Sequence, residues 1–426
     1  MIYYISNNFL KLLNKIVKSD QLTNKINRFN LTIAYQTINK LFEVKKKKFT
    51  NKQIKNLFFQ RGIKLNFNND GVYIKLLDLI IGEGDLKKNK NFFENFFKNL
   101  TPLPYQHKSW MRLRDILYLK SQIFLGGLCR EQSINSVVKS KSSFFLSHKD
   151  RARAMLERFL KNKINTEDFK LFPFEKYLNK RLFNNFIRIF FEDINIKIRS
   201  DKDQEDFINF LKNKNIAIVG PAAIENNNAS EIDSYDVVIR LNYTFSGKNL
   251  DEFHKGLKVD ISYYNGEQID HIIKNNNCRL PADLAMICIK DNSFKRFEKI
   301  KKVNPKKIIK KVTNYNALNF YSSLNLLPIT LLDILASDVK SIKVFHSDLF
   351  ITTMRNSNYY PRAFKREKLK QTKVLKESFL NHDPMMHHIL LKRIYQNSKI
   401  IGDDSFDRVM KMETHEYLKK LSDLYQ

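Results

Sequence analysis

The chain has 426 residues, of which 43% are hydrophobic and 12% aromatic, so it can bury a large core and is neither disordered nor fibrous. Its 75 Lys and Arg against 44 Asp and Glu give a formal net charge of +31, which suits nucleic acid, a membrane surface or a nucleotide as partner. The three cysteines, Cys129, Cys278 and Cys288, are too few and too scattered for a disulfide framework or a four-cysteine zinc site, which favours a reducing compartment.

The first 200 residues hold most of the excess charge, with 39 basic and 16 acidic side chains, a balance of +23. Apolar residues recur there at helical spacing, which predicts a mainly helical, basic N-terminal region of unknown role, with a helix break at Gly126-Gly127. Lys interleaved with Phe and Leu, as in 9–18, is typical of contact with an anionic membrane surface. The alternative is an ordinary solvated helix surface in a Lys-rich composition, and the sequence leaves both open.

The chain opens without a secretory signal, and no run reaches the ~18 apolar residues that a spanning helix needs. We therefore expect a cytoplasmic protein, peripheral on the inner membrane face if the basic region binds lipid. A nucleic-acid-binding protein is the competing class that the charge suggests. No RNP-like aromatic string or recognition helix supports it, so nucleic acid is the disfavoured partner.

The second half alternates short apolar strands with helices, beginning after the acidic stretch 201–206 with a helix over 207–212. This alternation predicts an α/β, Rossmann-like domain over 205–426, with a mostly parallel sheet flanked by helices. The expected strands are 216–219, 236–241, 285–289, 307–309 and 342–345, and a helix is expected over 328–337. Asp201-Lys202-Asp203 is a DxD string, but it precedes the first strand and is interpreted as a solvated linker.

The first expected strand ends at Gly220-Pro221-Ala222, where a parallel sheet presents its ligand-binding edge. Gly220 would let the backbone approach a ligand closely, and the small Ala222 keeps the approach open. The loop is not a dinucleotide fingerprint, because G-x-G-x-x-G needs glycines that are absent here. A plain tight turn is the alternative for the loop taken alone.

The passage from Ile216 to Asn242 reads IAIVGPAAIENNNASEIDSYDVVIRLN. It resembles the large donor-binding motif of glycosyltransferase family 29, the eukaryotic-type sialyltransferases, and suggests a divergent, bacterial-like member. The resemblance covers roughly residues 214–404 and implies a Rossmann-like GT-A variant fold. It also implies an inverting transfer of sialic acid, or a related nonulosonic acid, from a CMP-activated donor to a hydroxyl of a glycan or glycolipid, with no metal or other cofactor.

Three shorter stretches resemble the remaining motifs of the family. Ser322 and Ser323 stand where the family binds the donor, and Tyr360 falls in the short aromatic motif. His382 opens a helix at the position of the family's general base. The family's later Glu is replaced here by His387, and the Gly of the small motif is missing near Asn325.

Each of these residues also has a purely structural interpretation. His382 suits a general base because imidazole titrates near neutrality, yet it could simply belong to a helix cap. Asn242 could bind the donor through its planar amide or end its strand in an Asx-turn. We expect Arg240 to be a buried ion-pair partner of Asp233 or Asp236. A non-catalytic CMP-sugar binder therefore stands as an alternative to the sialyltransferase-like enzyme.

Overall fold

The structure is a computed structural model of the whole chain. It describes residues 107–119, 121–139, 147–163, 173–178, 183, 186, 189–190, 202–222, 226–243, 252–275, 277–290, 294–352, 378–398 and 400–425. Tyr360 and the basic stretch 9–18 lie outside the described residues, so the predictions made for them are not tested.

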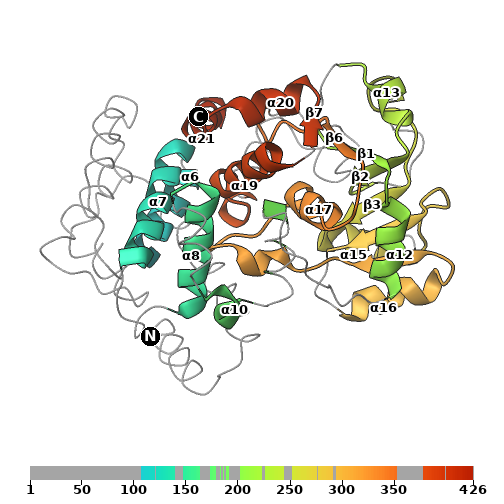
Figure 1. Cartoon of the computed structure of the whole chain (residues 1–426), viewed down its shortest axis with the longest axis horizontal. Helices are drawn as coiled ribbons and strands as arrows, with labels where there is room; N and C mark the ends of the chain where they lie inside the picture. Colours follow the sequence, from blue (N-terminus) through green and yellow to red (C-terminus); the bar gives the residue numbers. More distant parts are fainter. Residues whose placement is uncertain are drawn as a thin grey trace, which may run out of the picture. The chain divides into compact units, whose positions relative to one another are not determined.

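A seven-stranded, all-parallel sheet forms the centre of the described chain (Figure 1), which confirms the predicted Rossmann-like α/β architecture. The strands lie in the order β5-β4-β3-β2-β1-β6-β7. They are β1 (Asn215–Val219), β2 (Val237–Leu241), β3 (Ile261–Tyr264), β4 (Met286–Ile289), β5 (Ile308–Lys311), β6 (Ser341–Phe345) and β7 (Ile400–Gly402). The five strands predicted from the sequence are all present within two residues of their expected ends.

The strands form where short apolar runs can be buried on both faces of the sheet. All residues of β2, β3 and β4 are buried, as expected for strands of a parallel sheet covered by helices. Strands β3 and β7 escaped prediction. Strand β3 contains two tyrosines and a serine among its four residues, and β7 has only three residues, so neither gives a long apolar run.

The chain order of the strands creates a switch point in the sheet. From β1 the chain adds β2, β3, β4 and β5 on one side, and then returns to place β6 on the other side of β1. Val219 pairs with Phe345 across this junction. Ligands of open parallel sheets bind beyond the carboxyl ends of the strands at such a point.

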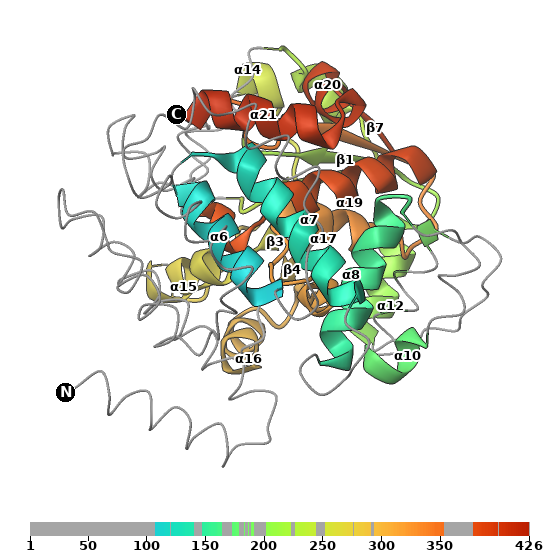
Figure 2. The same cartoon turned by 90° about the vertical axis from the view of Figure 1, so that its left-hand side faces the viewer.

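Helices pack on the sheet and beside it (Figures 1 and 2). They are α6 (His107–Leu119), α7 (Ile123–Lys139), α8 (His148–Leu160), α10 (Phe174–Tyr177), α12 (Lys202–Leu211), α13 (Ala229–Asp233), α14 (Glu252–Lys255), α15 (Gly266–Asn275), α16 (Phe294–Val303), α17 (Leu326–Ile334), α19 (Pro384–Asn397), α20 (Asp404–Lys411) and α21 (Thr414–Tyr425). Helices α12, α17, α19 and α20 contact strands directly. Within the described ranges, no helix is both long and apolar enough to cross a membrane.

Residues Thr101–Gln426 form one compact unit, so the boundary expected near 200–205 falls inside it. Helix α7 contacts α21, and α8 contacts α19 (Figure 2). The N-terminal helices therefore pack directly against the C-terminal helices. The predicted helical character of the N-terminal region is present in α6, α7 and α8. The helix break predicted at Gly126-Gly127 is wrong, because both glycines lie inside α7. A Cβ on Gly126 would lie 2.4 Å from the Tyr118 ring, and a Cβ on Gly127 would lie 2.5 Å from Leu418. The two glycines therefore allow neighbouring helices to pack closely.

Candidate functional site

His382 lies at the start of α19, as predicted from the sequence. The next residue, Asp383, is the N-cap of that helix and accepts a hydrogen bond from the Met386 amide at 3.1 Å. The Nδ1 atom of His382 lies 2.9 Å from the carbonyl oxygen of Ser323, 59 residues earlier in the chain. Because a carbonyl only accepts, Nδ1 carries the hydrogen and Nε2 presents a lone pair. In the described part of the chain Nε2 makes no hydrogen bond.

The charge state of His382 follows from its surroundings. Burial, and after it the nearby charge of Lys290, lower the pKa of His382 to about 4, although the hydrogen bond to Ser323 acts in the opposite direction. The imidazole is therefore neutral at neutral pH. A neutral histidine held through Nδ1, with Nε2 open, has the form that a general base requires, but its basicity is weaker than the ideal for catalysis near neutrality.

The loop before α17 brings three basic side chains together. The backbone of Ser323, Leu324 and Asn325 contacts, in that order, His382, Lys290 and His387. The Nζ of Lys290 donates to the Leu324 carbonyl, and the Asn325 amide lies 3.3 Å from Nε2 of His387. Three consecutive residues of one loop thus face three basic side chains, one just after β4, one just before α19 and one within α19.

The same loop leads into a helix that has no side-chain cap. Asn325 is the N-cap of α17, but its side chain forms no capping hydrogen bond. The Oγ of Ser322 is buried and finds no hydrogen-bond partner among the described residues. The amides at the start of α17 and this hydroxyl are the kinds of group that bind phosphate or carboxylate oxygens. The helix predicted over 328–337 is present as α17, which begins at Leu326 and ends at Ile334.

His387, where the resembling family has Glu, is 2% exposed and belongs to the same group of side chains. Its ring centroid lies 5.9 Å from that of His382, and its Nε2 lies 3.2 Å from the Ser323 carbonyl. Burial, and next the neighbouring His382, lower its pKa to about 3. Its Nδ1 is buried, and no described residue offers it a hydrogen bond.

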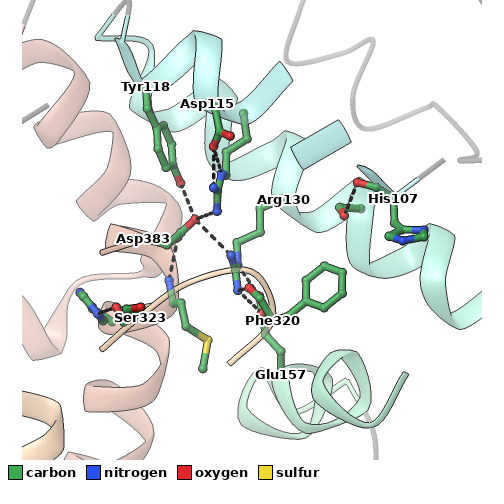
Figure 3. Close-up of polar contacts among 12 residues, drawn as sticks. His107, Asp115, Tyr118, Arg130, Glu157, Phe320, Ser323 and Asp383 are labelled. Atoms are coloured by element: carbon green, nitrogen blue, oxygen red, sulfur yellow. Dashed lines mark hydrogen bonds and ion pairs between the residues drawn. The ribbon is translucent and has the colours of Figure 1, made fainter. Parts of the chain in front are cut away.

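Asp383 holds the start of α19 through a buried charge network (Figure 3). Its Oδ2 accepts from Arg114 Nη1 at 2.8 Å, Arg130 Nη1 at 3.2 Å and the Tyr118 hydroxyl at 3.3 Å. Arg130 also pairs with Glu157 at 2.6 Å. The side chains of Arg130, Glu157 and Asp383 are all fully buried. The arginines come from α6 and α7, so the N-terminal helices fix the residue that follows His382.

Arg130 connects the network to the loop before α17 as well. Its Nη2 donates to the Phe320 carbonyl at 2.7 Å, three residues before Ser323. Phe320 is fully buried with Met111, Ile134, Val137 and Ala154 from α6, α7 and α8. The guanidinium of Arg130 therefore holds both segments of the site: the loop that contains Ser323, through Phe320, and the chain around His382, through Asp383.

Gly220 has a structural role at the end of β1. A Cβ at this position would lie 2.4 Å from the His346 carbonyl oxygen, so the glycine allows the ends of β1 and β6 to approach each other, and its predicted role in ligand binding stays a prediction. The Ala222 amide donates to the same carbonyl at 3.0 Å, and Ala222 is 1% exposed. The buried Lys255 holds the loop by donating to the carbonyls of Gly220 and Ala222 at 3.2 and 2.9 Å.

We expect Gly220→Ala to lower the free energy of unfolding by about 1–3 kcal/mol, the usual cost of overpacking, because the obstructing atom belongs to the backbone. Gly266→Ala is the matched control: its Cβ would lie 3.3 Å from the mobile end of Arg296, and alanine favours the helix there. Urea denaturation of both variants measures the difference. Equal stability of the two variants would contradict this role for Gly220.

Arg240 and Asp233 act together, but not as the predicted ion pair. Arg240 donates to the carbonyls of Lys255, Gly256 and Lys258, at 2.9, 2.9 and 3.0 Å. Asp233 accepts from the amides of Leu257 and Lys258 in the same turn. A Cβ on Gly256, which has φ +66°, would lie 2.3 Å from the Asp233 carboxylate. Both residues therefore hold the turn that carries Lys255, and through it the Gly220 loop.

Asn242 ends β2 with a backbone φ of +53° and is 2% exposed. Its Oδ1 accepts from the Asn265 amide at 3.1 Å, which joins the loops after β2 and β3. This long-range contact is structural, but it is not the Asx-turn considered for Asn242, in which Oδ1 would accept from an amide two residues along the chain. Left-handed backbone also occurs at His346, directly after β6, and at Tyr321, directly before Ser322. Backbone strain of this kind concentrates at functional sites.

The structure thus brings some of the predicted site residues together and leaves others apart. Ser323 and His382 are in contact, and Ser322 adjoins them. Gly220, Ala222 and Asn242 occupy the same edge of the sheet, but no contact joins them to His382 within the described residues. Among those residues no group of three or more His, Cys, Asp or Glu could hold a metal ion, which leaves the predicted metal independence untested.

Sequence reasoning missed Lys290, Arg114 and Arg130. Lys290 follows a predicted strand directly, so its place at the ligand edge of the sheet could have been read from the strand pattern. The two arginines lie in a region that is rich in basic residues, and no local pattern distinguishes a buried arginine from an exposed one there.

A scan against protein-family models finds no match, and a search of curated proteins finds no relative.

Proposed function

We propose that the chain is a glycosyltransferase that transfers sialic acid, or a related nonulosonic acid, from a CMP-activated donor to a hydroxyl of a glycan or glycolipid. The observation that carries the proposal is the hydrogen bond between His382 Nδ1 and the Ser323 carbonyl. The sequence assigned these two residues separately, one to the base and one to the donor, and their contact is what such a site needs.

In the proposed reaction His382 is the general base. Its Nε2 accepts the proton of the acceptor hydroxyl while that oxygen attacks the anomeric carbon of the donor, and CMP leaves with the bonding electrons. The α17 N-terminus and the Ser322 hydroxyl are placed to bind anionic oxygens of the donor. Such a reaction needs no further cofactor, because the donor already carries a good leaving group.

Binding of CMP tests the donor side of the proposal. We expect saturating CMP to raise the melting temperature, since a ligand at 100 times its Kd adds about 2.7 kcal/mol to the stability of the folded state. AMP, with the same phosphate and another base, is the control. Asn242→Asp keeps the Oδ1 that accepts from Asn265 but loses the amide donor, and it should abolish the shift.

Release of CMP tests the reaction itself. The protein is incubated with CMP-sialic acid and a panel of galactosides, and CMP is measured with and without each acceptor. Acceptor-dependent release supports the proposal. No stabilisation by millimolar CMP together with no release of CMP would overturn it.

The second candidate function is a non-catalytic CMP-sugar binder. It is favoured by the low pKa of His382, which makes the imidazole a weak base, and by the presence of His387 in place of the family's Glu. This candidate predicts stabilisation by CMP but no release of CMP, with no effect of His382 substitutions on binding.

The remaining predictions concern location and partners. A cytoplasmic protein whose basic N-terminal region binds an anionic membrane surface would meet glycolipid acceptors there. Binding to vesicles with and without anionic lipid distinguishes this from a region of ordinary solvated helices.

A further inference from the structure

Among the described residues, Lys290 is a cation of the candidate site for which no acidic partner is found. It follows β4 and its Nζ donates to the Leu324 carbonyl. An ammonium has three N–H donors, and within the described residues neither a second hydrogen bond nor a carboxylate occupies the other two. Burial alone lowers its pKa to about 8, so it is still mainly charged at neutral pH.

The groups around Lys290 are suited to an anion. The hydroxyl of Ser322 is buried without a partner, and so is Nδ1 of His387, whose side chain is almost fully buried. The amides at the start of α17 lack a side-chain cap. Among the described residues, two buried polar atoms without a partner thus lie near an ammonium with open donors, at a helix start without a side-chain cap, and together they indicate a place that a ligand completes.

We infer that Lys290 binds the anionic group of the ligand, a phosphate or carboxylate, and that this contact determines when His382 can accept a proton. That the anion belongs to a CMP-activated sugar rests on the proposed function. The coupling between Lys290 and His382 does not, because it follows from their shared loop: His382 contacts Ser323, and Lys290 contacts Leu324.

The titratable and charged groups that face His382 come from three directions. Lys290 approaches from the end of β4, and His387 lies one turn along α19. Asp383 follows in the chain, but its charge is taken up by Arg114 and Arg130 from α6 and α7. Lys290 is thus the uncompensated charge, and it opposes protonation of His382.

The consequence is a base whose strength depends on the ligand. In the free protein the ammonium of Lys290 repels the proton that His382 would accept. An anion bound to Lys290 offsets that charge, so the proton affinity of His382 rises when the ligand is in place. Departure of the anion restores the weak base.

Titration of the histidines by NMR tests this coupling, with inorganic phosphate and CMP as separate probes. In the wild-type protein we expect either probe to raise the pKa of His382 by roughly one unit, the scale of a nearby charge. Lys290→Met should raise the pKa of His382 without any ligand and abolish the response to phosphate. Lys290→Arg, which keeps the charge, should retain both the low pKa and the response.

His388 is the internal control, because its ring contacts Thr414 and Val409 rather than this loop, and its signal should not respond to either probe. A response of His382 to phosphate that is equal in wild-type and Lys290→Met would overturn the inference. Should Lys290→Met fail to fold, absence of any wild-type response to phosphate and CMP would do so as well.

The two proposals fail in different ways. If phosphate raises the pKa of His382 but CMP-sialic acid yields no CMP, the anion site stands and the proposed function falls. If CMP is released with an acceptor while neither probe moves the His382 signal, the function stands and the role of Lys290 falls.

Discussion

Asp383→Asn is expected to lower the free energy of unfolding by about 3–5 kcal/mol, the cost of removing one partner from a buried ion pair. The carboxylate is fully buried and accepts from Arg114 and Arg130. The pKa of Asp383 lies below its ordinary value: the two arginines stabilise its charge against the opposing effect of burial. Without that charge, the positive charges of the two buried guanidinium groups are no longer fully balanced by nearby carboxylates.

The asparagine substitution removes the charge of residue 383 but keeps a side-chain oxygen that can cap the helix. Asn caps a helix as well as Asp does, so the hydrogen bond from the Met386 amide can be kept. Glu416→Gln is the matched control, because its pair with Lys420 is exposed and such pairs contribute about 0–1 kcal/mol. Urea denaturation compares the three proteins. A loss in Asp383→Asn no larger than in Glu416→Gln would mean that the network does not stabilise the fold.

The sheet could be predicted from the sequence because most of its strands contain short clusters of apolar residues. Each of the five predicted strands holds at least two Ile or Val residues within four or five positions, which is typical of strands in a parallel sheet covered on both faces. Strand β3, with two tyrosines and a serine, is buried just as completely, because the hydroxyls of Tyr263 and Tyr264 bond to Asp333 and to the Tyr243 carbonyl. Those partners lie far from β3 in the chain, so no local pattern reveals them.

The candidate site was predictable only in part. Ser323 and His382 were singled out separately from two motif positions, and their contact was not predicted. Their support by Arg130 depends on the packing of α7 against the rest of the chain. Gly220 was identified correctly as a position of close approach, but the approaching atom is the backbone of His346. A pattern can indicate that space is needed at a residue without indicating which group uses it.

His382→Gln is expected to lower kcat for acceptor-dependent CMP release by about 10²–10⁴-fold, the usual contribution of a general base. Glutamine is similar in size to histidine and can still donate to the Ser323 carbonyl, but it cannot accept a proton from the acceptor hydroxyl. Donor binding should change little, because the proposed donor contacts are made by other groups. Steady-state kinetics with CMP-sialic acid and thermal stabilisation by CMP measure the two effects separately.

His415→Gln is the matched control, since that histidine lies on the exposed side of α21, with a side chain that is 51% exposed, and belongs to no part of the candidate site. It should leave kcat unchanged. A His382→Gln protein that is folded, binds CMP and turns over like the control would show that His382 is not the base. The base would then have to be sought among other groups at the carboxyl edge of the sheet, and the hydrogen bond between His382 and Ser323 would be a helix-end contact alone.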